Sequence, residues 1–265
     1  MSAGSEPRQR RIRRLEPAAV LGVMSRDATV FRRLWVPTTF TSVLEPTVYL
    51  LALGLGLGTL IKEVAGLTYV QFVGTGIVGS AVLFASMLPA MYGSFIKRRF
   101  QRTYDAMLAA PVDVEELVSA EMSWIGLRAG TYAMAPLIVT LFFGLPIEPT
   151  IVLVPLIGIL TGVGFAGLGL FIAGSVESIN NFDYVTSAVI TPLFLVSGVF
   201  FPIDQLPHWA QVASEFNPLY QCVTLVRHAV LGVAATDVLR ALMLVAFALL
   251  TWRLAIARTR RALID

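Results

Sequence analysis

The sequence predicts an all-α integral membrane protein with six transmembrane helices. Hydrophobic residues make up 56% of its 265 residues and charged residues only 14%, whereas an ordinary globular domain carries about 25% charged residues. The mean hydropathy is +0.76. The apolar residues gather into runs that reach the roughly 20 residues that a helix needs to cross the bilayer core. Such a chain leaves no room for a soluble catalytic domain.

The N-terminal region is expected to form a basic cytoplasmic tail over residues 1–15 and an amphipathic interface helix over residues 16–35. Pro17 suits the first turn of a helix. From Val20 to Trp35, apolar residues recur at helical spacing opposite charged residues, which is typical of a helix that lies in the membrane interface. The alternative is that this segment is the ordinary beginning of a spanning helix.

A six-span transmembrane domain is expected over residues 36–257, followed by a basic cytoplasmic tail over residues 258–265. The spans are placed near 36–60, 70–96, 121–143, 150–173, 184–201 and 237–257. Of the 20 lysines and arginines, 16 lie in the N-terminal region, in the loop 97–120 or near the C-terminus. Because basic residues favour cytoplasmic loops, both termini are predicted to be cytoplasmic.

The net charge of +3 does not indicate a nucleic-acid partner. The basic residues cluster beside apolar spans, where they act as topology signals and contact anionic membrane lipids. No nucleic acid is therefore expected among the partners.

The loop between the second and third spans is longer than a hairpin needs and predicts a helix over residues 98–111. Phe100, Tyr104 and Leu108 would share one face of it, opposite charged residues. An apolar face with this spacing is typical of a helix that binds in a partner's groove. The alternative is a helix that rests on the inner leaflet.

The connection 198–236 is apolar enough to dip into the outer leaflet. Two short helices are predicted there, about 207–216 and 219–231, the second ended by Gly232. Irregular backbone at membrane depth is tolerated only where protein or water covers it. The residues singled out in this outer segment are Gly198, Phe200, Phe201, Pro202, Pro207, Trp209 and Pro218.

Glu45 and Pro46 lie a third to half of the way into the first predicted span. A carboxylate at that depth costs a few kcal/mol on insertion scales, and such residues usually face a bundle interior or water. We therefore regard this pair as a candidate for the substrate pathway or a gate. The alternative is a structural carboxylate that is protonated or hydrogen-bonded to a neighbouring helix.

Glycines in the fourth predicted span spell a literal G-x-G-x-x-G, but the motif lies inside an unbroken apolar run from Ile151 to Ala173. A dinucleotide site needs a strand before the motif and a solvated helix start after it. Gly158, Gly162 and Ala166 instead form a face of small residues, which predicts close packing against another helix.

No catalytic, cofactor or metal site is predicted in this chain. Neither of its two lysines, Lys62 and Lys97, follows a glycine, so the sequence lacks the G-x-x-x-x-G-K-[ST] loop that cradles nucleotide phosphates. If ATP drives this protein, the ATPase that binds ATP and Mg²⁺ is a separate chain.

Three segments carry a resemblance to a known family. They are LEPTVYLLALGLGLG (44–58) followed by TYVQFVGTGIV (68–78), RRFQRTYDAMLAAPVDVEELVSAEMSW (98–124), and SGVFFPIDQLPHW (197–209) followed by NPLYQCVTLVRHAVLG (217–232). The second segment combines a helix, Ala-Pro and an acidic restart at Asp113 and Glu116 that resembles a capping box. Over about residues 16–257 the chain resembles the permease subunits of type-2 ABC exporters, in the branch of the nodulation-factor and daunorubicin-type exporters.

The resemblance implies a non-enzymatic half-transporter in the bacterial plasma (inner) membrane. Two permeases, here expected to be identical, would pair with two ATPase subunits and move an amphipathic substrate outward, either a lipid-linked glycan or glycolipid or a hydrophobic drug-like molecule. Residues 198–232 would form re-entrant helices on the outer side. The coupling helix would dock on the ATPase through Arg98, Arg99, Phe100, Arg102, Thr103, Tyr104, Asp105, Leu108 and Pro111.

The alternative function is a secondary transporter that needs no ATPase. Such transporters usually place several ionisable or broken-helix features at the membrane midplane, and only Glu45 qualifies here. An intramembrane enzyme is a third possibility, but the spans carry no cluster of histidines or acidic residues.

Overall fold

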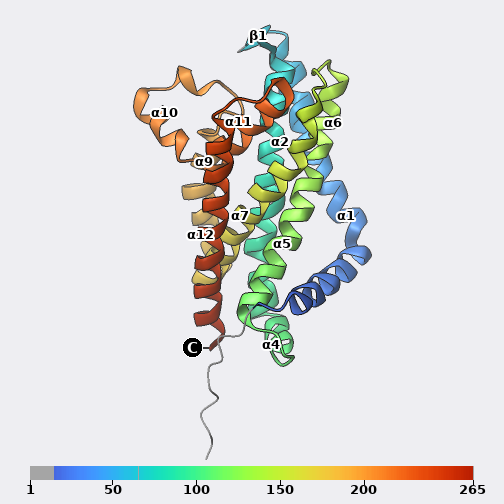
Figure 1. Ribbon diagram of the computed structural model, residues 1–265, viewed down its shortest axis with the longest axis vertical. Helices are drawn as coiled ribbons and strands as arrows, with labels where there is room; N and C mark the ends of the chain where they lie inside the picture. The colour runs from blue at the N-terminus through green and yellow to red at the C-terminus, as the bar shows by residue number, and fades with distance from the viewer. Residues whose placement is uncertain (1–14, 65, 265) are drawn as a thin grey trace, which may run out of the picture.

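The computed structural model describes residues 15–64 and 66–264, which form an almost entirely helical bundle (Figure 1). The expected all-α class is confirmed. The predicted tail 1–15 lies, apart from Leu15, outside the described residues. Within the described ranges, five helices are long and apolar enough to cross a membrane. They are built on α1 (Pro17–Gly58), α2 (Tyr69–Leu88), α5 (Val114–Tyr132), α7 (Leu153–Ser175) and α12 (Asp237–Ile264).

The long helices run between two ends of the molecule, which we call the α4 end and the β1 end (Figure 1). The short helix α4 (Thr103–Leu108), the beginning of α1 and the C-terminal end of α12 lie at the α4 end. The helix α10 (His208–Glu215) and a small antiparallel hairpin lie toward the β1 end. The hairpin pairs β1 (Glu63–Val64) with β2 (Leu67–Thr68). The basic loop 97–120 and the basic C-terminal segment therefore share one end, as the charge pattern predicts.

The helix α1 is continuous from Pro17 to Gly58, so the expected interface helix and first span are parts of one element. It begins with Pro17 in its first turn, as predicted. Figure 1 shows that its first part lies across the α4 end and that the helix then bends to run along the bundle. Pro37 and Pro46 lie inside α1. A proline removes a backbone hydrogen bond and its ring clashes with the preceding turn, which accounts for a bend.

The second predicted span, 70–96, is longer than expected. After α2, a π-helical stretch η1 (Pro89–Gly93) leads directly into α3 (Ser94–Arg99). The third span combines α5 with α6 (Met134–Phe142). Its capping box is confirmed, because the Asp113 backbone N–H donates a 2.9 Å hydrogen bond to the Glu116 carboxylate.

The fifth predicted span, 184–201, is shorter than a spanning helix. Three consecutive five-residue segments make it up, α8 (Asn181–Val185), the π-helical η3 (Thr186–Ile190) and α9 (Thr191–Leu195). At 1.5 Å per residue this run extends about 22 Å, below the roughly 30 Å of a bilayer core. The chain leaves the helix at Val196, so the prediction that helix continues to residue 201 is wrong.

The predicted face of small residues on α7 packs closely against α5. A Cβ atom on Gly162 would lie 3.1 Å from the Gly126 Cα atom, and one on Gly158 would lie 3.1 Å from the Gly130 Cα atom. Small residues, glycine above all, allow two helices to approach this closely. The packing interpretation of the glycine motif is therefore confirmed.

Beyond α9 the chain turns at Gly198 and forms η4 (Ile203–Gln205), α10 and α11 (Pro218–Leu231). The two predicted short helices are present within one residue of their expected starts, and Gly232 ends the second. The expected C-terminal tail 258–265 is not a separate element, because α12 continues to Ile264.

Candidate functional site

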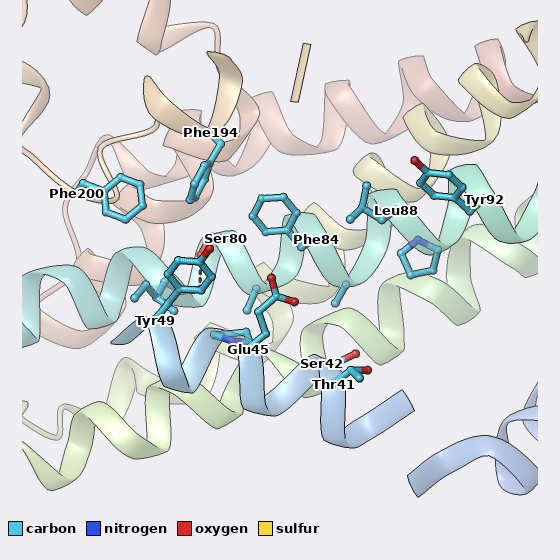
Figure 2. A pocket seen from close by; sticks show the side chains of 15 residues that line it. Thr41, Ser42, Glu45, Tyr49, Ser80, Phe84, Leu88, Tyr92, Phe194 and Phe200 are labelled. Carbon is cyan, nitrogen blue, oxygen red and sulfur yellow. Dashed lines mark hydrogen bonds between the residues drawn. The ribbon is translucent and has the colours of Figure 1, made fainter. Parts of the chain in front are cut away.

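A cavity of about 450 Å³ lies between α1, α2 and α9 (Figure 2). Residues four apart on α1 and three or four apart on α2 face it, as expected for one side of a helix. Its lining comprises Thr41, Ser42, Glu45, Pro46 and Tyr49 of α1; Ile77, Ser80, Ala81, Phe84, Ala85 and Leu88 of α2; Pro89 and Tyr92 of η1; Phe194 of α9; and Phe200. Aromatic and aliphatic groups dominate this surface, with hydroxyls spread among them.

Glu45 carries the one carboxylate in the lining of this cavity. Figure 2 shows it pointing into the space between Tyr49 and Phe84. It has no hydrogen bond or ion pair with any residue in the ranges 15–64 and 66–264. Glu45 also borders a second hollow on the outer face of α1, beside Phe40 and Val48. The described chain therefore does not hold this carboxylate in a fixed contact.

Three phenylalanines form one wall of the cavity. The rings of Phe84 and Phe194 meet edge to face with centroids 5.3 Å apart, and those of Phe194 and Phe200 do so at 5.1 Å. Such pairs contribute about 0.5–1.5 kcal/mol each beyond the burial of their surface. The wall joins α2 to α9 and to the outer segment, so a shift of one of these elements would change the shape of the cavity.

Arg227 of α11 fixes the turn that carries Phe200. Its guanidinium donates a 2.6 Å hydrogen bond to the Gly198 carbonyl and a 3.3 Å bond to the Phe72 carbonyl. It also lies 3.8 Å above the centre of the Phe72 ring. Gly198 adopts φ +72°, a conformation that favours glycine. The sequence analysis did not single out Arg227, although an arginine in an apolar helix is itself a signal of a buried contact.

The other residues singled out in the outer segment have different positions. Pro202 and Pro207 precede η4 and α10, and Pro218 opens α11. Phe201 is 36% exposed and Trp209 is 73% exposed. Among the outer-segment residues singled out from the sequence, Phe200 alone lines the cavity.

At the α4 end, the predicted single helix over residues 98–111 is broken in two. The helix α3 ends at Arg99, and α4 begins at Thr103 after Arg102, which adopts the left-handed φ of 49°. The break separates Phe100, which is 67% exposed, from Tyr104, which is 2% exposed. The predicted apolar stripe therefore does not form.

Tyr104 faces the protein interior and exposes almost none of its side chain to the predicted ATPase contact. Its hydroxyl donates a short hydrogen bond to the Glu121 carboxylate of α5. Burial, and then the neighbouring Glu121, raises the pKa of the Tyr104 phenol well above its usual value. The phenol consequently stays neutral and keeps the proton that it donates.

Two more of the expected contact residues also serve the fold. The Arg98 guanidinium donates a 2.7 Å hydrogen bond to the Ala173 carbonyl near the end of α7, and Leu108 packs against a buried cluster on α5, α7 and α12. Thr103 is half-buried. The exposed remainder of the predicted set, which we call the α4 surface, is Arg99, Phe100, Arg102, Asp105 and Pro111.

Comparison with known proteins decides the family. Residues 19–231, which span α1 through α11, match the family model described as ABC-2 type transporter. The chain belongs to the ABC-2 type transporter family. The resemblance to type-2 ABC exporter permeases that the sequence predicted is thereby confirmed.

Relatives of this ABC-2 permease include nodulation proteins and an inner membrane transport permease. Nodulation protein J of Rhizobium leguminosarum bv. trifolii is 30% identical over 82% of this chain and 83% of its own length. Nodulation protein J of Rhizobium meliloti (strain 1021) is 27% identical over 80% of this chain and 81% of its own. The inner membrane transport permease YadH of Escherichia coli (strain K12) is 27% identical over 89% of this chain and 94% of its own.

Proposed function

We propose that two copies of this chain form the membrane pathway of an exporter driven by two copies of a separate ABC ATPase, which binds ATP and Mg²⁺. The substrate is an amphipathic molecule, either a lipid-linked glycan or glycolipid or a hydrophobic drug-like compound. The observation that carries this proposal is the cavity around Glu45, which lies beside a helix that the rest of the chain scarcely covers. The chain itself performs no covalent chemistry.

A second copy would complete the cavity. Only 11% of the most apolar stretch of α1 is buried, and α1 forms one wall of the cavity. A volume of about 450 Å³ suits a compact drug-sized ligand, whereas a glycolipid needs a larger enclosure. Pairing two chains along α1 and α9 would bury the uncovered face and enlarge the enclosed space.

The α4 surface is the proposed ATPase contact. It combines one exposed aromatic side chain, Phe100, with the cations Arg99 and Arg102 and the anion Asp105. Aromatic and arginine side chains contribute much of the binding energy at protein interfaces. Docking therefore depends on Phe100 and Arg102 rather than on Tyr104, which is buried.

The proposed location is the bacterial inner membrane, with six crossings and both termini in the cytoplasm. The name of the relative YadH supports the membrane. The run from α8 to α9 would supply the crossing between α7 and α12. Because this run is shorter than the bilayer core is thick, the bilayer would be thinned locally around it. An even number of crossings puts both termini on the same side, and the basic residues at the α4 end favour the cytoplasm for that side.

The α4 surface is tested by co-purification and transport in proteoliposomes. Phe100→Ala combined with Arg102→Ala should lower ATPase capture about tenfold or more, as expected when a contact aromatic is lost. Trp209→Ala is the matched control, because Trp209 is as exposed as Phe100 but lies on α10. A double variant that still binds a fully coupled ATPase would contradict the docking surface. Transport that follows a proton gradient without any ATPase would favour the secondary transporter.

Orientation is tested by labelling single cysteines in a Cys222→Ser background. Gln205→Cys, in η4, should react with a membrane-impermeant maleimide from outside the cell. Asp105→Cys, on the α4 surface, should react only after the membrane is opened. Labelling of Asp105→Cys in intact cells would overturn the proposed topology.

A further inference from the structure

A buried charged cluster joins four helices at the α4 end. The Glu121 carboxylate of α5 accepts a 2.7 Å hydrogen bond and ion pair from the Lys97 ammonium of α3, and the hydroxyls of Tyr104 of α4 and Ser94 of α3 also donate to it. The same ammonium lies 3.5 Å from the Asp27 carboxylate of α1. We call Asp27, Ser94, Lys97, Tyr104 and Glu121 the Glu121 cluster.

The burial of these groups makes the cluster costly to open. The side chains of Glu121 and Asp27 are 1% and 6% exposed, and that of Lys97 is 27% exposed. A buried charge is stable only while its oppositely charged partner stays in place. If one partner is removed, the other becomes an unpaired buried charge, which strongly destabilises the fold. The four helices can therefore move together far more easily than they can separate.

The cluster is also connected to two of the elements that line the cavity, α1 and η1. Asp27 lies on α1, the helix that continues to Glu45. Lys97 lies on α3, which follows directly from η1, where Pro89 and Tyr92 line the cavity. Tyr104, the remaining member that binds Glu121, lies on α4, and the next residue, Asp105, is exposed and belongs to the α4 surface.

We propose that Glu121 is a positioning residue that links movement of α4 to the two helices lining the cavity. A displacement of α4 pulls on Glu121 through Tyr104, and Glu121 holds α3 through Lys97 and, through the same ammonium, α1. The inference rests on the proposed function only for the agent that moves α4, namely the docked ATPase. The linkage itself is a property of this chain and is measurable without a partner.

The first test uses the permease alone in nanodiscs. Spin labels are placed on two exposed positions, Ser25→Cys of α1 and Ala106→Cys of α4, in the Cys222→Ser background. The distance distribution should be narrow in the parent and clearly broader after Glu121→Gln or Tyr104→Phe. Glu115→Gln is the matched control: Glu115 lies on the same helix and pairs with Arg260 at 2.8 Å, but it is partly exposed and outside the cluster. The distance distribution in Glu115→Gln should match that of the parent.

The second test uses the complex with its ATPase. Glu121→Gln should retain ATPase capture while the substrate moved per ATP hydrolysed falls about tenfold, equivalent to ~1.4 kcal/mol of lost coupling. Glu115→Gln should leave that ratio unchanged. If Glu121→Gln does not assemble, Tyr104→Phe decides, because it removes only the hydroxyl.

The outcomes separate the two proposals. Unchanged distances in Glu121→Gln and Tyr104→Phe, or unchanged coupling in a complex that is otherwise active, would overturn the role of Glu121. Absence of ATP-driven transport in the parent itself would contradict the proposed function, and the distance measurement would still decide the linkage.

Discussion

The helices α1 and α2 are both long and apolar, yet the fold treats them in opposite ways. In the most apolar stretch of α2, 83% of the residues are buried, whereas in that of α1 the share is 11%. The helix α2 packs against α1, α5, α7 and α11, while α1 contacts the bundle along one side (Figure 1). Hydropathy reports that both helices avoid water, but it cannot report which neighbour covers them. The uncovered face of α1 is the face along which we propose that two copies pair.

The largest effect is expected where α5 and α7 pack closely against each other. A Cβ atom on Gly126 of α5 would lie 2.7 Å from the Val163 backbone nitrogen of α7. Gly126→Leu should therefore destabilise the protein by about 2–3 kcal/mol through overpacking. Gly56→Leu on α1 is the control, because a Cβ atom there meets nothing within 4 Å. Thermal unfolding in detergent compares them, and equal loss in both would contradict the contrast between the two regions.

An intermediate effect is expected on the α1 side of the cavity. Glu45→Gln keeps the shape of the side chain and removes its charge, which faces the cavity without a partner in the described chain. Hydrogen bonds to charged groups contribute about 1.5–3 kcal/mol, so substrate-stimulated ATPase activity should fall about tenfold or more. Capture of the ATPase should not change. The control is Glu148→Gln, an exposed carboxylate before η2 (Pro149–Val152). If Glu45→Gln behaves as the parent, a structural carboxylate is the better account.

The smallest effect is expected at a polar contact between α1 and α5, on the side of α1 that the bundle covers. The hydroxyls of Thr39 of α1 and Tyr132 of α5 lie 3.0 Å apart. Hydrogen bonds between membrane helices average ~0.6 kcal/mol, so Thr39→Ala should lower the free energy of unfolding by about that amount. The reference is Thr41→Ala, whose hydroxyl bonds only to carbonyls of its own helix. A loss of several kcal/mol on Thr39→Ala would show that α1 is held more firmly than its burial indicates.

Local rules predicted much of the fold. The start of α1 at Pro17, the start of α5 at the Asp113 capping box and the end of α11 at Gly232 were predicted correctly. Each of these signals acts on the backbone of its immediate sequence neighbours. The small residues of α7 predicted close packing because no larger side chain fits between helices that nearly touch. The family was predicted correctly as well, from three segments that cover the end of α1 and the beginning of α2, the run from α3 into α5, and the chain from Ser197 through α11.

The failures concern contacts across the chain. Periodicity placed Phe100 and Tyr104 on one face, but the left-handed turn at Arg102 separates them, and neither glycine nor proline marks that turn. The buried pairing of Tyr104 with Glu121 depends on a residue seventeen positions away, which no local pattern reveals. The fifth span was placed too far along because the apolar run continues past α9 into a turn held by Arg227.

The π-helical stretch η1 lies between the part of the cavity lined by α2 and the Glu121 cluster. A π turn holds about one residue more than an α turn, so Pro89–Gly93 contains a residue that a regular helix would not need. Deletion of a single residue there would let α2 run into α3 as an unbroken α-helix. Because the π turn already accommodates the extra residue, the helices on either side would keep nearly their present rotation about the axis, and Lys97 would still face Glu121. The change would fall on the wide turn itself, which carries Pro89 and Tyr92 into the cavity lining. The extra residue therefore shapes the cavity rather than the Glu121 cluster.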